Sequence, residues 1–245
     1  MATAPSVASN LDLPAIVVRP GASRFHSRFG WLDSWHTFSF ADHYDPDWMG
    51  FGPLRVINDD TVAAHHGFGM HPHRDMEIVT VMVEGELQHR DSLGHTELLK
   101  AGEVQRMSAG TGVVHSEMNV SDQPCRFLQI WIEPIQRGLS PAYEQTFFPP
   151  SHDWTLLLDP AASSGAMAIA RPVRLWRAQP QAGDRLVLPA IPGRQVWLQL
   201  VDGSLDLPAP LQRGDGLGFT MPDQQLDWIA GSAGADMLLF ELPTA

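Results

Sequence analysis

Residues 71–87 have the sequence His-Pro-His-Arg-Asp-Met-Glu-Ile-Val-Thr-Val-Met-Val-Glu-Gly-Glu-Leu, and they decide the fold prediction. At the centre of this stretch, residues 78–83 are rich in β-branched side chains, which favour strands. Glu84-Gly85 closes the run, and residues 86–89 continue after that turn. The stretch therefore predicts a strand, a tight turn and a second strand.

The same pattern recurs in the second half of the chain. Val83-Glu84-Gly85-Glu86-Leu87 resembles Val201-Asp202-Gly203-Ser204-Leu205, and Ala101-Gly102-Glu103 resembles Arg213-Gly214-Asp215. The glycines are 102 − 85 = 17 residues apart in the first copy and 214 − 203 = 11 in the second. A strand–turn–strand unit that occurs twice, with a shorter middle turn in the second copy, predicts two similar β-barrels in tandem.

The composition is typical of a packed, strand-rich protein. Hydrophobic residues make up 44% of the 245 residues and charged residues 18%, which excludes a disordered chain. Twenty-one Gly and twenty Pro interrupt short apolar runs, which favours short strands over long helices. The formal net charge of −12 argues against binding to nucleic acid or to anionic membranes, because phosphates are bound by basic side chains. It leaves a protein partner open.

The sequence gives no sign of export. Cys125 is the single cysteine, so no intramolecular disulfide can form. Residues 1–10 lack the basic and apolar regions of a secretory signal. No apolar run approaches the roughly 20 residues of a membrane helix. We therefore expect a cytoplasmic protein.

Two pairs of polar residues predict a metal site. His71 and His73 are two residues apart, as are His115 and Glu117. On a strand, such residues point to the same face, so both pairs can converge on one ion if the two segments lie side by side. Three imidazoles and one carboxylate suit Fe, Cu, Ni, Mn or Zn and leave room for substrate or oxygen. Glu77 has the strand parity of the first pair, so spacing alone does not reject it as the carboxylate ligand.

The other histidines are expected to have other roles. His65 and His66 are adjacent and would face opposite sides of a strand, which makes both poor ligands. His36 lies among aromatic residues and is expected in the core or on a pocket wall. Three histidines in polar or turn contexts are predicted to lie at the surface: His89, His95 and His152.

Longer segments around these residues resemble the pirin family of bicupins, and most closely its bacterial quercetin 2,3-dioxygenase-like branch. The resemblance is strong from about residue 24 to 147 and weaker to the end of the chain. The segments that carry it are residues 33–42, 49–60, 69–77, 102–103 and 108–119.

This resemblance implies an all-β fold of two tandem cupin barrels of the jelly-roll type. A metal-binding N-terminal domain would span residues 1–147, and a C-terminal domain without metal ligands would span residues 148–245. At the positions of His71 and His73, the C-terminal copy has Pro189 and Ile191. We therefore expect one divalent transition metal ion per chain, with Fe(II) expected first and Cu, Ni, Mn or Zn as alternatives.

The resemblance also implies the ligand set, because pirin-like proteins take the carboxylate from the second motif. The ligands would then be His71, His73, His115 and Glu117, and Glu77 would be a partner that fixes an imidazole.

The activity implied is the oxygen-dependent opening of a flavonol such as quercetin, with release of carbon monoxide. A carboxylate at the metal can take the proton of the flavonol hydroxyl, so Glu117 is also the expected catalytic base. Aromatic side chains within residues 29–51 are expected to wall a flat apolar pocket. Arg74 or Arg106 is expected to orient a polar group of the substrate.

Two other functions stay open at this point. Pirin-like proteins include nuclear cofactors and partners of metabolic enzymes, so the chain can instead be a non-enzymatic, metal-binding regulator that contacts a protein. A cupin with a structural metal and a different small substrate is the third function, because one fold hosts many activities.

Overall fold

The computed structural model describes residues 16–244. Within this range the chain consists of β-strands and three short 3₁₀ turns, so the all-β prediction is confirmed. The turns are Gly21–Ser23, Pro46–Trp48 and Ser163–Gly165. None of the helical segments in residues 16–244 has the length and hydropathy to span a membrane. The predicted lack of a secretory signal concerns residues 1–10, which lie outside the described residues.

The chain divides into two compact units. The N-terminal unit holds residues 24–149 and 158–172. Of the described residues, the C-terminal unit holds 16–23, 150–157 and 173–244. The predicted boundary between residues 147 and 148 stays a prediction. Two short strands, β13 (Thr155–Asp159) and β14 (Met167–Ala168), pair in parallel through Leu158 and Met167.

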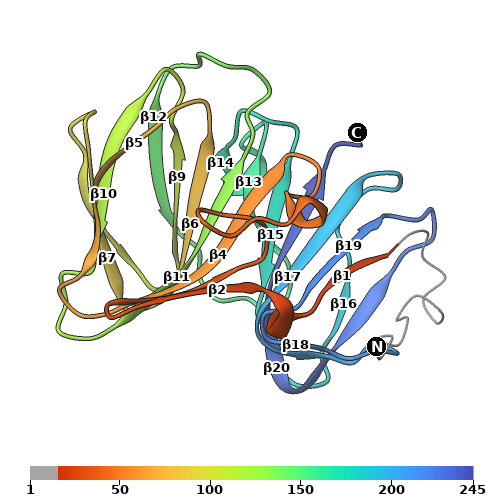
Figure 1. Cartoon of the computed structure of the whole chain (residues 1–245). Helices are drawn as coiled ribbons and strands as arrows, with labels where there is room; N and C mark the ends of the chain where they lie inside the picture. Colours follow the sequence, from red (N-terminus) through yellow and green to blue (C-terminus); the bar gives the residue numbers. More distant parts are fainter. Residues whose placement is uncertain (1–15, 245) are drawn as a thin grey trace. The chain divides into compact units, whose positions relative to one another are not determined.

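Residues 24–149 of the N-terminal unit form two antiparallel sheets that face each other (Figure 1). The first sheet has the strand order β12-β9-β6-β11-β4-β3-β2, and the second has the order β5-β10-β7-β8. The strands of the first sheet are β2 (Phe25–Phe29), β3 (Leu32–His36), β4 (Leu54–Val62), β6 (Glu77–Glu84), β9 (Glu103–Ser108), β11 (Cys125–Ile132) and β12 (Ala142–Phe147). Those of the second sheet are β5 (Gly67–His73), β7 (Glu86–Asp91), β8 (Thr96–Lys100) and β10 (Val113–Met118).

Apolar side chains from both sheets form the core of this unit. Val62, Met82 and Phe127 of the first sheet pack with Leu87 and Leu99 of the second, and all five are almost fully buried. Burial of each such side chain contributes roughly 1.5–3 kcal/mol to stability. Because this core holds the two sheets together, polar side chains can occupy other positions between the sheets.

The predicted internal repeat is visible in the backbone. Gly85 and Gly203 have φ angles of 73° and 72°, and Gly102 and Gly214 both have 87°. These left-handed values are readily adopted by glycine because it lacks a Cβ atom. The amide of Gly102 donates to the carbonyl three residues before Gly85, and the amide of Gly214 donates to the carbonyl three residues before Gly203. The two copies of the repeat therefore have the same backbone conformation and the same hydrogen bond at this turn.

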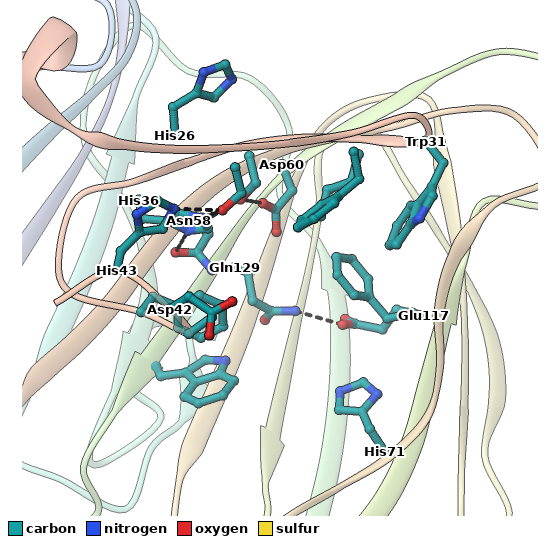
Figure 2. Close-up of a pocket in the computed structure, with 18 of the residues that line it drawn as sticks. His26, Trp31, His36, Asp42, His43, Asn58, Asp60, His71, Glu117 and Gln129 are labelled. Carbon is teal, nitrogen blue, oxygen red and sulfur yellow. Dashed lines mark hydrogen bonds between the residues drawn. The ribbon is translucent and has the colours of Figure 1, made fainter.

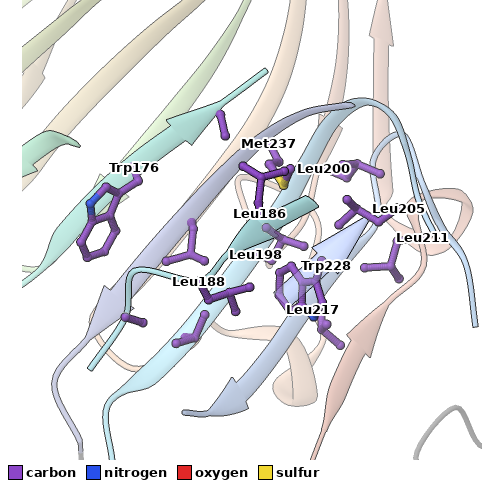
Figure 3. Packing of buried hydrophobic residues seen from close by; sticks show 14 of the residues in the cluster. Trp176, Leu186, Leu188, Leu198, Leu200, Leu205, Leu211, Leu217, Trp228 and Met237 are labelled. Carbon is purple, nitrogen blue, oxygen red and sulfur yellow. The ribbon is translucent and has the colours of Figure 1, made fainter. Parts of the chain in front are cut away.

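The C-terminal unit contains one antiparallel sheet with the order β1-β19-β17-β20-β15, in which β16 also pairs with β20 and β18 with β17. Its core is a cluster of Leu, Met and Trp side chains that includes Trp176, Leu198, Trp228 and Met237 (Figure 3). The strands are β1 (Val17–Arg19), β15 (Arg174–Ala178), β16 (Arg185–Val187), β17 (Gln195–Leu205), β18 (Leu211–Gln212), β19 (Gly216–Thr220) and β20 (Asp227–Leu242).

Close packing between β5 and β10 leads to a first prediction. A Cβ atom at Gly67 would lie 2.2 Å from the Glu117 carbonyl oxygen and 2.7 Å from the Cα atom of Met118. The Gly67→Ala substitution must therefore separate the two strands that carry the predicted ligands, at a cost of about 1–3 kcal/mol. We expect a lower urea midpoint and a lower metal content after purification.

Gly69→Ala is the matched control on the same strand, because nothing lies within 4 Å of a Cβ atom at Gly69. Unfolding followed by fluorescence and elemental analysis of both variants makes the comparison. Equal stability and equal metal content in the two variants would contradict the tight packing of β5 on β10.

Candidate metal centre

Antiparallel pairing of β5 with β10 brings the predicted ligands together. His115 lies opposite His71, and His73 follows two residues further along β5. A bulge between His115 and Glu117 shifts the register, so that Glu117 lies opposite Phe68. His73 and His115 are 115 − 73 = 42 residues apart in the sequence. The pairing of β5 with β10 thus makes the two predicted ligand pairs neighbours on adjacent strands.

The three imidazoles converge on one point. Their ring centroids are 4.8 Å apart for His71 and His73, 4.4 Å for His71 and His115, and 4.9 Å for His73 and His115. One nitrogen of each ring lies within 4.8 Å of the others. Burial and the neighbouring imidazoles lower the pKa of His73 to about 4 and that of His115 to about 3. The site therefore favours the neutral form of these two rings, which is the form that binds a metal ion.

The hydrogen bonds of these rings leave nitrogen lone pairs available for an ion. His71 Nδ1 lies 2.7 Å from the Gly69 carbonyl oxygen, which only accepts, so Nδ1 carries the proton and Nε2 has the lone pair. His115 Nε2 is buried and has no hydrogen-bond partner. A buried nitrogen without a partner is costly, and a metal ion would remove that cost. The residues therefore fit a divalent transition metal.

The Glu117 carboxylate lies beside this group but is not part of it. Its Oε2 accepts a hydrogen bond of 2.8 Å from Gln129 Nε2, and its Oε1 accepts one of 3.2 Å from the Thr80 hydroxyl. Glu117 lines the same cavity as His71 and His73. Its assignment as the fourth ligand stays a prediction.

Glu77 is not a partner of the histidines, so that prediction is wrong. The Ser108 hydroxyl lies 2.7 Å from both of its carboxylate oxygens, and Arg106 lies close enough to lower its pKa, although burial raises it overall. The chain turns at Asp75, whose φ angle is +51°, and β6 then starts in the other sheet. Strand parity with His73 does not continue across this turn.

His89 was predicted to lie at the surface, and this is also wrong. The side chain is fully buried on β7, and its Nδ1 lies 3.5 Å from His115 Nδ1. The side chains of His95 and His152 are 37% and 61% exposed, in closer agreement with the prediction. The alternation of side chains along a strand could have predicted the burial of His89. Leu87 and His89 are two residues apart, so if Leu87 points into the core, His89 points to the same side.

A chain of hydrogen bonds runs from Asp91 through His89 to His115. Asp91 Oδ2 lies 2.9 Å from His89 Nε2, which must donate to the carboxylate, so His89 Nδ1 accepts from His115 Nδ1. Burial would raise the pKa of Asp91, but hydrogen bonds from His89, His95 and backbone amides lower it to about 2. The ionised carboxylate thereby fixes the tautomer in which His115 Nε2 is free to bind a metal.

His71 and His73 open onto a cavity of about 510 Å³ between the two sheets (Figure 2). Aromatic walls were predicted from residues 29–51, and Phe29, Trp31 and Phe40 do line it. Phe68 and Trp131 also line the cavity and were not anticipated. The His73 and Trp131 rings lie edge to face, 4.9 Å apart. Flat aromatic rings therefore form part of the cavity wall.

Neither predicted arginine lines this cavity, so that prediction is wrong. Arg106 is buried against Ser108 and Glu144, and Arg74 lies along a different hollow. His36 was expected either in the core or on a pocket wall. Its side chain is buried and also lines the cavity, so both expectations hold.

Asp60 is a second buried carboxyl group on the cavity wall. It accepts a hydrogen bond from the Ser34 hydroxyl. Burial raises its pKa from 3.8 to about 7, and the nearby Asp59 and Glu117 charges add to the effect of burial. Asp60 is therefore largely protonated below neutral pH.

Comparison with known proteins identifies the family. The model for the Pirin family matches residues 19–132, and the model for the quercetinase C-terminal cupin domain matches residues 156–242. An Escherichia coli K12 protein named quercetin 2,3-dioxygenase is 42% identical over 229 residues, which cover 93% of this chain and 99% of that protein. The chain belongs to the pirin family.

Solved structures of pirins and quercetin dioxygenases share this fold. The crystal structure of YhhW from Escherichia coli superposes with a TM-score of 0.89 and 42% identity, covering 94% of this chain and 99% of that chain. That of the bacterial pirin YhhW in complex with nickel(II) has a TM-score of 0.88 and covers 100% of that chain. A quercetin 2,3-dioxygenase from Acinetobacter baumannii, at 19% identity, covers 79% of its chain with a TM-score of 0.77 and supports the fold alone. The predicted pair of tandem cupin domains is confirmed.

The histidine trio lies in the N-terminal domain of this pirin-family chain. Within residues 16–244, no other group of three or more His, Cys, Asp or Glu side chains converges in this way. The expectation of one metal ion per chain stays a prediction.

The Asp91–His89–His115 chain leads to a second prediction. His89→Phe removes the group that accepts from His115 Nδ1, so the ring loses its fixed tautomer and we expect metal affinity to fall by about 10–100-fold. Competition with a chromogenic chelator measures the affinity. His95→Phe is the control, since His95 also lies 2.9 Å from Asp91 Oδ2. A similar loss in both variants would show that His89 acts through packing and not through His115.

The raised pKa of Asp60 gives a third prediction. Between its unfolded value of 3.8 and its folded value of about 7, the folded state binds a proton that the unfolded state has released. The free energy of unfolding therefore falls as the pH rises through this window. Relative to Asp60→Asn, the unmodified protein should lose on the order of 2 kcal/mol between pH 5 and pH 7.

Urea unfolding at several pH values tests this difference. The exposed Asp47 provides the control, because Asp47→Asn should leave the pH dependence of stability unchanged. Parallel pH profiles for the unmodified protein and Asp60→Asn would mean that Asp60 is ionised at low pH in the folded state.

Proposed function

We propose that this pirin-family chain is a metal-dependent dioxygenase that opens flavonols such as quercetin. The proposal depends on one observation: three imidazoles converge on one point, and two of them line a cavity that also contains aromatic side chains and the Glu117 carboxylate. The name of the Escherichia coli relative, quercetin 2,3-dioxygenase, supports the same reaction class.

The proposed ligands are His71, His73, His115 and Glu117. The nickel(II) complex of the bacterial pirin YhhW supports a divalent ion in this fold, and Fe(II), Cu, Mn and Zn suit the same donors. When bound, the ion supplies Lewis-acid chemistry that orients substrate and oxygen.

Glu117 is proposed to take the proton of the flavonol hydroxyl. A carboxylate oxygen within hydrogen-bonding reach of that hydroxyl is a suitable general base. The Gln129 amide at 2.8 Å and the Thr80 hydroxyl at 3.2 Å hold one oxygen each, so the carboxylate keeps a fixed orientation. The proton moves from the flavonol oxygen to a Glu117 oxygen and leaves an electron-rich ring system.

The overall reaction balances without a further reductant. One oxygen atom of O₂ bonds to each of the two ring carbons that flank the hydroxylated carbon. The O–O bond and both ring carbon–carbon bonds of the hydroxylated carbon break, and that carbon leaves with its own oxygen as carbon monoxide. The product is a ring-opened ester that carries a carboxylic acid group, to which the proton held by Glu117 returns. The chain supplies the base and a cavity that excludes water from the reacting ring.

The cavity suits a flat aromatic substrate. Its volume of about 510 Å³ lies in the range of small-molecule sites. Trp31 and Phe68 lie edge to face with centroids 5.3 Å apart, and so do Phe40 and Trp131 at 5.4 Å. Such ring pairs present rigid apolar surfaces on which a planar molecule can stack.

Glu117→Gln gives the fourth prediction. The amide cannot act as a base, so turnover of quercetin should fall by about 100-fold or more. The three imidazoles remain, so the variant should still bind metal. Loss of flavonol absorbance under air and under nitrogen measures turnover, and elemental analysis measures metal. The exposed Glu97 provides the control, because Glu97→Gln should leave both readouts unchanged.

Two outcomes would contradict this proposal at different points. Full activity of metal-loaded Glu117→Gln would refute the base role alone. Metal-loaded, unmodified protein that consumes no flavonol in air would refute the dioxygenase function and favour a regulatory, protein-binding role.

A further inference from the structure

The wall of the cavity across from the histidines is polar. It is formed by side chains of β2, β3 and β4, and in Figure 2 His36, Asn58 and Asp60 lie on the other side of the cavity from His71 and Glu117. We call this surface the polar wall; its residues are Ser27, Ser34, His36, Asn58 and Asp60. The proposed reaction uses none of them.

Part of the polar wall is satisfied within the protein. His36 Nδ1 lies 2.8 Å from Asn58 Oδ1, and its Nε2 lies 2.9 Å from the Ser27 oxygen. Burial lowers the pKa of His36, so the ring is neutral, with Nδ1 donating and Nε2 accepting the Ser27 proton. The Ser27 oxygen then accepts from His43 Nε2 at 3.0 Å. Both nitrogens of His36 are therefore occupied, and the ring fixes the orientation of the Asn58 amide.

Two groups of the polar wall have hydrogen-bonding capacity left over. Within the described part of the chain, Asn58 makes no hydrogen bond through Nδ2, and Asp60 makes one through Oδ1 to Ser34 but none through Oδ2. Both residues are 3% exposed, and both line the cavity. Neither of these two atoms is among the fully buried side-chain atoms that lack a partner, so both are accessible from the cavity and available to a ligand there.

The two residues are two apart on β4, so they present their side chains to the same face. Asp59, between them, faces the opposite way and forms an ion pair with Arg126 at 2.8 Å. An unpaired donor and an unpaired carboxyl oxygen therefore lie next to each other on the cavity side of one strand.

We propose that Asn58 and Asp60 form a subsite for a hydroxyl group on the end of the substrate farthest from the metal. This inference rests on the proposed flavonol dioxygenase function and specifies its substrate class. The oxygen of one phenol hydroxyl can accept a hydrogen bond from the Asn58 amide. The same hydroxyl can donate to the Asp60 carboxylate, or accept from the Asp60 carboxyl group when that group is protonated. The preferred substrates are then flavonols with a hydroxyl on an outer ring position, not the bare flavonol skeleton.

The chemistry of the subsite makes it selective. A site with buried hydrogen-bonding groups discriminates strongly against analogues that lack the matching hydroxyl, because its own groups are then left unpaired. The aromatic walls, in contrast, hold any flat ring system with similar strength. Discrimination among flavonols should therefore come from β4 and not from the stacking residues.

The fifth prediction compares three ligands on metal-loaded protein without oxygen, so that binding is measured without turnover. The ligands are 3-hydroxyflavone and its 7-hydroxy and 4′-hydroxy derivatives, each of which adds one outer hydroxyl and no second chelating group. At least one derivative should bind roughly tenfold more tightly than 3-hydroxyflavone to the unmodified protein. Titration calorimetry or quenching of tryptophan fluorescence gives the dissociation constants.

Asn58→Ala and Asp60→Ala should remove this preference and leave the affinity for 3-hydroxyflavone and for the metal within about twofold of the original. Thr61→Ala is the control, since Thr61 is the next residue on β4 and faces away from the cavity. The ligand comparison on unmodified protein remains decisive even if a variant does not fold.

The outcomes separate the two proposals. Equal affinity of all three flavonols for the unmodified protein, or an equal loss for all three in both variants, would overturn the subsite while flavonol binding stands. Failure of every flavonol to bind metal-loaded protein would overturn the proposed function, and the subsite with it.

Discussion

The pairing of β5 with β10 is the contact on which the metal centre depends. It places His115 opposite His71, and the bulge after His115 lets Glu117 also face the cavity. Because side chains alternate along a strand, a slip of one residue would turn the histidines of one strand away from those of the other. Gly67 packs against the backbone of β10, where a Cβ atom would clash with Glu117 and Met118. A slip that moved a residue with a side chain into this position is therefore disfavoured.

This pairing forces several polar groups into the space between the sheets, and each needs a partner. Gln129 and Thr80 hold Glu117, and Asp91 holds His89. A metal ion would satisfy the remaining lone pairs of the imidazoles, which links metal binding to the stability of the N-terminal unit. The C-terminal unit has no such need, since its core consists of leucine, methionine and other apolar side chains (Figure 3).

Local patterns in the sequence predicted the features that depend on strand periodicity and on glycine. The run of residues 78–83 lies in the middle of β6, and Gly85 and Gly203 adopt the same left-handed conformation in the two copies. The His71 and His73 pair also followed from periodicity, because both residues lie on one uninterrupted strand.

The features that were missed depend on contacts between segments far apart in the chain. Parity suggested Glu77 as a neighbour of the histidines, but the turn at Asp75 moves it into the other sheet. His89 has a polar sequence context, yet the pairing of β7 with β10 buries it beside His115. Trp131 reaches the cavity from β11, which no local pattern connects to the site. Periodicity thus predicts the face of a strand, whereas sheet pairing decides what that face meets.

The charges in the cavity are consistent with a substrate that becomes an anion. With three neutral imidazoles, a divalent ion and the Glu117 carboxylate would leave one positive charge, which a deprotonated flavonol can neutralise. A second ionised carboxyl group would oppose this balance. Burial favours the neutral form of Asp60, so this side chain can bind a hydroxyl group without adding a full negative charge beside the reacting ring. The two carboxyl groups also differ in their hydrogen bonds: Glu117 accepts two, from Gln129 and Thr80, whereas Asp60 accepts one, from the Ser34 hydroxyl.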